Sequence, residues 1–171
     1  MFIQNGAEVN IQNESLKTPL MIACFYGRLE FIKELRANGA SYDLRDRSGM
    51  SCVHYAVDGG NPTALEYILA DGAGVNTRDS MNGWTPLLRG ASINCSHEIA
   101  NILIRYKADI DAVDKENKSA LLIATINGNL PLVRLLIEHG ANINIKNNYG
   151  KSLYDLALSM DRKVFLIFFI N

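Results

Sequence analysis

The sequence predicts an all-α protein in which short pairs of helices are stacked as a solenoid. The first observation is a phrase that recurs five times, as TPLMIA at Thr18, SCVHYA at Ser51, TPLLRG at Thr85, SALLIA at Ser119 and SLYDLA at Ser152. The second is its period, because the leading hydroxyl residues are 33, 34, 34 and 33 positions apart. Self-similarity at such a period is typical of stacked supersecondary units rather than of one globular core.

Each unit is predicted to contain two helices. A Ser or Thr before an apolar run is a typical N-cap, and a Pro that follows it, as in the first and third copies, suits the first helical position. A second apolar stretch follows each of the first four phrases, and its apolar residues recur at helical spacing. These second stretches begin at Leu29, Ala64, Glu98 and Leu130.

The connections between units are predicted from glycine and polar residues. Gly39, Gly72 and Gly140 follow second helices, where the residue past the C-cap adopts a left-handed conformation that glycine accepts at little cost. Polar connectors such as SYDLRDRSGM and NINIKNNYGK come next, with Asp, Asn and Gly in the places that a tight turn needs. The unit is therefore a short hairpin-like turn, a helix, a short loop and a helix.

This unit resembles the ankyrin repeat over the whole chain, through its TPLH-like start, its Gly-Ala after the second helix and its D-x-x-G turn. The resemblance implies an ankyrin-repeat solenoid. The segment from Asn82 to Leu87, one extra residue before His97 and the Met160-Asp161-Arg162 close are also similar to the ankyrin segment of the fibronectin type III and ankyrin repeat proteins.

We expect residues 1–171 to form a single domain. Its parts are a partial repeat at 1–13, repeats at about 14–46, 47–79, 80–114 and 115–147, and an incomplete repeat at 148–171. FIQNGAEVNIQN aligns with LIEHGANINIKN, which predicts that Phe2 and Ile3 end a second helix whose start lies upstream. VFLIFFIN places Val164 and Ile167 at sites that are polar in other repeats, which leaves open a face awaiting a neighbour or a self-contact.

Composition excludes several classes of function. The formal net charge is −1 with charges of both signs interspersed, so the basic surface of a nucleic-acid-binding protein is missing. No apolar run approaches the length of a membrane span, and no secretory signal is evident, so we expect a chain without membrane partners in the cytoplasm, the nucleus or both. Cys24, Cys52 and Cys95 suggest neither a disulfide framework nor a zinc site.

Catalysis is not expected either. His54, His97 and His139 are the obvious candidates for a general base, but none shares a motif with a nucleophile. The chain has neither a phosphate-binding glycine loop, a C-x-x-C pair nor an H-E-x-x-H helix, so we predict no enzyme activity, no metal and no cofactor. The family resemblance implies that His54, fourth in SCVH, braces neighbouring loops by hydrogen bonding.

The resemblance places partner binding in a groove formed by the connector turns and the first helices. The positions there that vary between copies are Phe25, Tyr26, Arg47, Met50, Asp58, Met81, Trp84, Arg89, Ile93, Lys118 and Asn127. Aromatic residues and Arg dominate binding energies in alanine scans, and the favoured candidates are Phe25, Tyr26, Trp84, Arg89 and Met81. The alternatives are that Trp84 only packs on the adjacent turn and that Tyr26 is an amphipathic surface residue.

Some positions depart from the repeat pattern. Lys107 replaces the glycine after a second helix, at an expected cost on the order of 1 kcal/mol, and Asn117 replaces a turn glycine, which Asn tolerates better. The third repeat has an extra residue in its interhelix loop and another in the turn from Asp79 to Gly83, so we expect it to be the least regular. The family resemblance also implies possible asparaginyl hydroxylation at Asn144, Asn10 and Asn76.

Three hypotheses about function follow. The first is a non-enzymatic scaffold that binds an unidentified intracellular protein through the groove, as a monomer. The second is a structural or oligomerising spacer of a longer protein, which dimerises through its apolar C-terminal helix. The third is a regulatory arm of an enzyme whose catalytic domain lies elsewhere in a longer chain.

Overall fold

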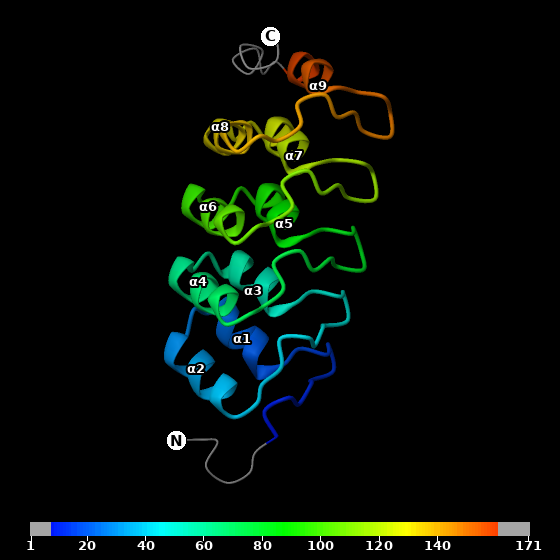
Figure 1. Ribbon diagram of the computed structural model, residues 1–171. Coiled ribbons are helices and arrows are strands. Elements are labelled where there is room, and N and C mark those ends of the chain that lie inside the picture. The colour runs from blue at the N-terminus through cyan, green and yellow to red at the C-terminus, as the bar shows by residue number, and fades with distance from the viewer. Residues whose placement is uncertain (1–7, 161–171) are drawn as a thin grey trace.

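The computed structural model describes residues 8–160, and in this part of the chain nine short helices form a regular stack. The helices are α1 (Pro19–Phe25), α2 (Leu29–Ala37), α3 (Cys52–Gly59), α4 (Pro62–Ala70), α5 (Pro86–Ser92), α6 (His97–Arg105), α7 (Ala120–Asn127), α8 (Leu130–Glu138) and α9 (Leu153–Ser159). The expected all-α solenoid is confirmed. In Figure 1 the first helices α3, α5 and α7 lie between the second helices on one side and the projecting connectors on the other.

The hydroxyl residue of each phrase lies at the start of a first helix, as predicted. Thr18, Thr85 and Ser119 each accept a hydrogen bond from a backbone N–H in the first turn, at 3.2 to 3.3 Å. Ser51 forms a capping box with His54, in which the backbone N–H of Ser51 donates to Nδ1 of His54 at 3.2 Å. Helix α4 begins earlier than its apolar run, since Asn61 caps it and Pro62 takes the first helical position.

The left-handed residues after the second helices are also where the sequence predicts them. Gly39, Gly72 and Gly140 have φ values of +86°, +97° and +83°, and Lys107 takes the same place at +67°. The turn residue Asn117 has a φ of +59°. Leu16 takes the corresponding turn position of the first connector, at +60°, and the sequence analysis did not single it out.

The connectors fold into hairpins that are joined in a row. In the connector before α3, the backbone N–H of Asp46 donates to the carbonyl of Met50 at 3.1 Å, and the side chain of Asp46 accepts from the N–H of Ser48 and of Met50. Single backbone bonds then join each hairpin tip to the next, from Arg47 to Ser15, Ser80 to Ser48, Lys115 to Asn82 and Asn148 to Glu116, at 2.9 to 3.1 Å. The tips therefore form a continuous edge along the stack (Figure 1).

Both insertions expected in the third repeat are present. Its turn hairpin keeps the row of bonds by using Asn82 as the acceptor for Lys115, so the extra residue bulges outward and leaves Met81 67% exposed. In the loop after α5, Asn94 takes the left-handed conformation at a φ of +55°, and Cys95 and Ser96 precede α6 where the other loops have one residue. The stacking of helices on either side is unaffected, since α5 packs on both α3 and α7.

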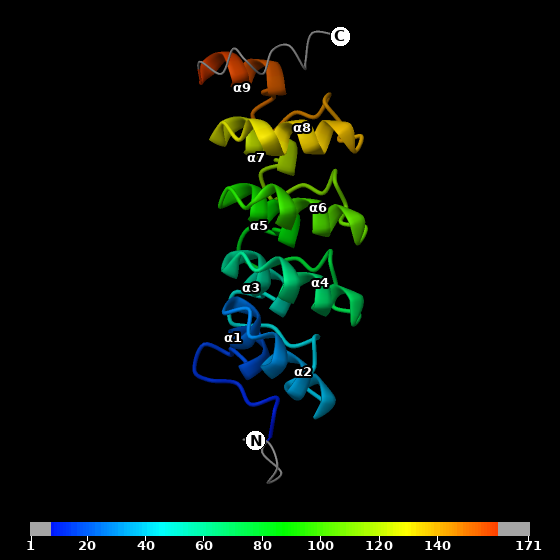
Figure 2. The ribbon, with the colours of Figure 1, turned by 90° about the vertical axis from the view of Figure 1, so that its left-hand side faces the viewer.

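The core runs the length of the stack. Each first helix packs against the next one, and each second helix lies beside its own first helix and the next second helix (Figure 2). Leu20, Val53, Leu87, Leu121 and Leu153 are among the buried residues that link the repeats. The solenoid therefore buries apolar surface between neighbours, as the repeat predicts.

The cysteines, the metal-ligating side chains and the lengths of the helices bear on the class of function. Cys24 and Cys52 are buried free thiols, Cys95 is a partly buried one, and burial raises the pKa of Cys95 to about 11. Within residues 8–160 no three metal-ligating side chains are grouped, and no helix there is long and apolar enough to cross a membrane. The predictions that concern Phe2, Ile3, Val164 and Ile167 lie outside the described residues.

Candidate functional site

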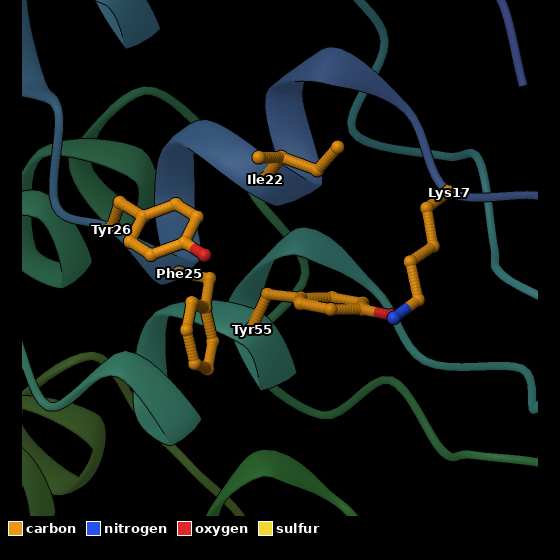
Figure 3. Close-up of a pocket in the computed structure, with 5 residues that line it drawn as sticks. All are labelled: Lys17, Ile22, Phe25, Tyr26 and Tyr55. Atoms are coloured by element: carbon orange, nitrogen blue, oxygen red, sulfur yellow. The ribbon is translucent and has the colours of Figure 1, made fainter. Parts of the chain in front are cut away.

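Two adjoining cavities lie where α1 and α3 meet the first two hairpins. The first, of about 290 Å³, is lined by Lys17, Ile22, Phe25, Tyr26 and Tyr55 (Figure 3), and we call it the aromatic pocket. The second, of about 480 Å³, is lined by Ser15, Lys17, Phe25, Asp46, Arg47, Ser48, Met50, Tyr55 and Asp58. Lys17, Phe25 and Tyr55 line both cavities, so the two cavities form one continuous groove.

One face of α1 supplies the apolar wall of the aromatic pocket. Phe25 and the C-cap residue Tyr26 follow Ile22 by three and four positions, so both lie on the same side of α1 as Ile22. All three are exposed, by 44%, 39% and 64%, which is unusual for large apolar side chains that lie together. The rings of Phe25 and Tyr26 meet edge to face, with centroids 5.1 Å apart.

Tyr55 of α3 forms the floor of the pocket. Its side chain is buried, and its hydroxyl donates to Oδ2 of Asp46 at 2.7 Å. Burial, together with that carboxylate, raises the pKa of Tyr55 above its ordinary value, so the phenol stays protonated. The ammonium of Lys17 lies 5.4 Å from the centroid of the ring, within range of a cation–π interaction.

A glycine allows α1 and α3 to approach closely enough to make this wall and floor. A Cβ atom built on Gly59 would lie 1.8 Å from the carbonyl oxygen of Phe25, which is far inside van der Waals contact. Gly59 is the last residue of α3, and Phe25 is the last residue of α1. The position of Phe25 in the pocket therefore depends on the absence of a side chain at residue 59.

A charged pair lies next to the apolar wall. Arg89 of α5 donates from Nε and Nη2 to the two carboxylate oxygens of Asp58 in α3, at 2.7 and 3.0 Å. The guanidinium carbon of Arg89 also lies 5.9 Å from the ring of Trp84. This geometry satisfies both oxygens of Asp58 and connects the second repeat to the third.

Trp84 packs on the adjacent turn, which is the structural alternative considered for it from the sequence. Its indole Nε1 donates to Oδ2 of Asp114 in the following hairpin at 3.3 Å, and the side chain is partly buried. This hydrogen bond shows that Trp84 has a structural partner of its own.

The eleven groove candidates separate into three groups. Phe25, Tyr26, Arg47, Met50 and Asp58 line the two cavities. Arg89 lies beside them through its two bonds to Asp58, and Trp84 lies next to Arg89. The remaining candidates, which are Met81, Ile93, Lys118 and Asn127, line neither cavity.

The outlying candidates have different surroundings. Met81 lies at a hairpin tip and Ile93 at the end of α5, both exposed. Lys118 pairs with Glu116 at 3.0 Å, and the side-chain amide of Asn127 donates to the carbonyls of Ala91 and Ser92 at 3.0 and 3.3 Å. Asn127 therefore has a structural role at the end of α5. Contact between any groove candidate and a partner stays a prediction.

Sequence reasoning did not include Ile22 and Tyr55 among the candidates, although both line the aromatic pocket. The signal was present in the repeat, since residues 22, 55 and 89 occupy the same position after the hydroxyl residue of their phrases. Arg89 was chosen from this position because of its residue type.

His54 has the bracing role that the family resemblance implies. Its Nε2 lies 3.0 Å from the carbonyl oxygen of Trp84 in the next repeat, and burial lowers the pKa of its imidazole. His139 lies at the end of α8, with Nδ1 2.9 Å from the carbonyl of Leu135. Neither is hydrogen-bonded to a Ser, Thr or Cys nucleophile placed in a cavity, because the one hydroxyl beside His54 is that of the buried cap Ser51.

Two of the asparagines considered for hydroxylation tie repeats together. Asn10 donates to the carbonyl of Gly39 and accepts from the N–H of Ser41, at 3.1 and 2.8 Å. Asn76 makes the same pair of bonds to Lys107 and Asp109, at 3.2 and 2.8 Å. Asn144 is exposed, and its backbone N–H donates to the side-chain oxygen of Asn142 at 2.9 Å. Hydroxylation of Asn144, Asn10 or Asn76 stays a prediction.

Comparisons with known proteins agree with this architecture. A family model described as ankyrin repeats (3 copies) matches residues 1–79 and 72–147. The putative palmitoyltransferase ZDHHC13 of Danio rerio is 35% identical over 158 residues, which cover 91% of this chain and 24% of that protein. The B-cell lymphoma 3 protein of Homo sapiens is 36% identical over 157 residues, which cover 89% of this chain and 34% of that protein.

A further relative is similar over more of its own length. The probable 26S proteasome regulatory subunit p28 of Saccharomyces cerevisiae is 30% identical over 153 residues, 88% of this chain and 67% of that protein. The chain spans only 24% and 34% of the other two relatives. The narrower resemblance to fibronectin type III and ankyrin repeat proteins stays a prediction, and Asp161 and Arg162 lie outside the described residues.

Proposed function

The chain belongs to the ankyrin-repeat family, and we propose that it is a non-enzymatic scaffold that binds a partner protein through the groove at α1 and α3. Ankyrin repeats generally mediate protein–protein interaction. The observation that carries the proposal is the aromatic pocket, where Ile22, Phe25 and Tyr26 are exposed together beside the partly buried Lys17. Exposed apolar side chains grouped in a concave site are typical of interaction surfaces.

The fold favours binding by a preformed surface. The hairpin tips are joined by backbone hydrogen bonds, and Phe25 is held by the contact of α1 with α3. A rigid surface loses little conformational entropy when a partner binds, so more of the interaction energy appears as affinity.

The proposal is tested by a matched pair of substitutions. Phe25 and Phe31 are both 39% exposed, but Phe25 lines the aromatic pocket and Phe31 lies in the second helix α2. We expect Phe25→Ala to abolish capture of specific partners from a cell lysate, measured by mass spectrometry, and Phe31→Ala to preserve it. Far-UV circular dichroism of both variants checks that helicity is retained. Equal capture by the wild-type chain and Phe25→Ala would contradict the groove assignment.

A second candidate function is self-association through the C-terminal end of the stack. Tyr154 and Leu158 of α9 are 43% and 45% exposed, whereas Leu20 and Cys24, at the same positions of α1, are buried against α3. Sedimentation equilibrium across a hundredfold concentration range distinguishes the two candidates. A dimer that is lost in Tyr154→Ser favours the spacer, and a monomer at every concentration rejects it.

A third candidate is a regulatory arm in a longer enzyme. It is favoured by the zebrafish relative, which is named a putative palmitoyltransferase and of which this chain covers 24%. Under this hypothesis the ankyrin-repeat segment itself would still act by binding a protein. The complete reading frame would test it, because a catalytic domain in the same chain is required.

A further inference from the structure

The charged side chains around the groove differ in how many hydrogen bonds and ion pairs they already make, and this difference indicates what kind of segment binds there. Four charged side chains line the second cavity, which are Lys17, Arg47, Asp46 and Asp58. Formally they cancel. Their hydrogen bonds differ, however, and the difference decides which charges are available to a partner.

Both carboxylates are already satisfied within the protein. Asp46 is buried, and it accepts from the hydroxyl of Tyr55 and from the backbone N–H groups of Ser48 and Met50, at 2.7 to 2.8 Å. Asp58 accepts from Arg89 through both of its oxygens. Each of the four carboxylate oxygens therefore already accepts at least one hydrogen bond within the protein.

The two cations are not paired in this way. The ammonium of Lys17 lies over the ring of Tyr55, and Arg47 donates to the backbone carbonyl of Glu14 at 2.5 Å. Among the residues that the structure describes, neither cation has a carboxylate within 4.0 Å. Arg47 is exposed and Lys17 is partly exposed, so the charge that the groove offers to a partner is positive.

We propose that the groove selects an acidic peptide segment of its partner, in which a large apolar side chain enters the aromatic pocket and a neighbouring carboxylate meets Lys17 or Arg47. This inference rests on the proposed function. The apolar anchor provides most of the affinity, because it is removed from water between Ile22, Phe25 and Tyr26. The carboxylate adds little affinity, because a charge at the rim of an interface is screened by solvent. Its contribution is to selectivity and to the rate of association.

The test uses a display library of random seven-residue peptides, selected on the wild-type chain. We expect the recovered peptides to contain a Phe, Trp, Leu or Met within three positions of an Asp or Glu. The most frequent sequence is then synthesised, and its Kd is measured by fluorescence anisotropy at low and high salt concentration.

Five variants, among them Arg47→Gln as a companion to Lys17→Gln, assign the effect to individual side chains. Phe25→Ala is expected to weaken binding about thirtyfold, as for a buried anchor of roughly 2 kcal/mol, and Tyr26→Ala provides a second variant at a more exposed position. Lys17→Gln is expected to weaken binding about threefold at low salt and to reduce its salt dependence. Lys33→Gln is the matched control, because Lys33 also lies over a tyrosine ring, at 5.9 Å, but on α2.

The outcomes separate this inference from the function on which it rests. Recovered peptides that need Phe25 but lack acidic residues, or that bind Lys17→Gln and Arg47→Gln as tightly as the wild-type chain, would overturn the acidic segment and leave groove binding intact. Recovery of no peptide sensitive to Phe25→Ala and Tyr26→Ala would overturn both. An equal loss of binding in Lys33→Gln would show that net charge, rather than the groove, attracts the peptide.

Discussion

His54 and Trp84 join two repeats through a single hydrogen bond, with Nε2 of the imidazole 3.0 Å from the carbonyl oxygen of the tryptophan. Because the backbone N–H of Ser51 donates to Nδ1, that nitrogen carries no proton and Nε2 is the donor. The neutral imidazole is completely buried in the stack. Burial lowers its pKa and outweighs the opposite effects of the Trp84 carbonyl and the nearby Asp79 carboxylate.

The first prediction is that stability decreases as the pH falls from 7.5 to 5.5. The folded state holds His54 neutral, so the unfolded state binds the proton first, below an unfolded pKa of about 6.5. The contribution is therefore present above that pH and is lost below it. Denaturant unfolding should show a smaller decrease in the free energy of unfolding for His54→Gln than for the wild-type chain. A pH dependence in His54→Gln equal to that of the wild-type chain would contradict the assignment to His54.

The second prediction concerns the pair of Asp58 and Arg89. Their side chains are 16% and 29% exposed, so the pair lies between a surface and a buried ion pair. A double-mutant cycle with Asp58→Asn and Arg89→Met should give a coupling free energy of about 1 kcal/mol. The exposed pair of Glu30 and Lys33 within α2 is the comparison, with a coupling of about 0.3 kcal/mol or less. Equal couplings for the two pairs would contradict the bidentate geometry.

The third prediction concerns the left-handed conformation of Lys107. Replacing it by glycine, the residue at the equivalent positions 39, 72 and 140, should stabilise the protein by about 1 kcal/mol. Gly140→Lys is the reciprocal test, since its φ is +83° and a Cβ there would touch nothing within 4 Å. It should lower the free energy of unfolding by a similar amount. Thermal denaturation of both variants measures the difference, and shifts of the same sign would refute the conformational explanation.

The fourth prediction is that Gly59→Ala destabilises the protein. In an exposed helix this change would stabilise by up to about 1 kcal/mol, because alanine has the higher helix propensity. Here the added Cβ would meet the carbonyl of Phe25, so α1 must move away from α3. We expect a net loss of about 2 kcal/mol by chemical denaturation. Thr63→Ala, an exposed substitution in α4, should change stability by about 0.5 kcal/mol at most.

The local structure of this protein was predictable because its signals act over a few residues. Thr18 and Thr85 cap helices, Gly39 and Gly140 take left-handed conformations, and the irregular turn at Met81 bulges, all as expected. Each depends on backbone groups three to five positions away. The exception was Leu16, where a left-handed residue is not evident from its type.

The binding site was only partly predictable, for the opposite reason. Phe25 and Tyr26 could be recognised as candidates from their residue types and repeat positions. Tyr55 shares a repeat position with the candidate Arg89, but it comes 30 positions after Phe25, and only the stacking of α1 and α3 shows that both line the same pocket. The role of Gly59 was also hidden from the sequence. A side chain at residue 59 is excluded by the carbonyl of Phe25, which belongs to another repeat.

The charged residues show most clearly what the sequence determines and what only the tertiary structure determines. The sequence by itself establishes the repeat, the helix pairs and a near-neutral composition, because these follow from periodicity, capping and counting. The sequence does not show which of Asp58, Arg89 and Lys17 are paired with each other. Only the stacking of repeats pairs Asp58 with Arg89 and leaves Lys17 beside an apolar pocket. The physical reason is that these contacts join residues of different repeats, which are far apart in the sequence and meet only when the helices pack.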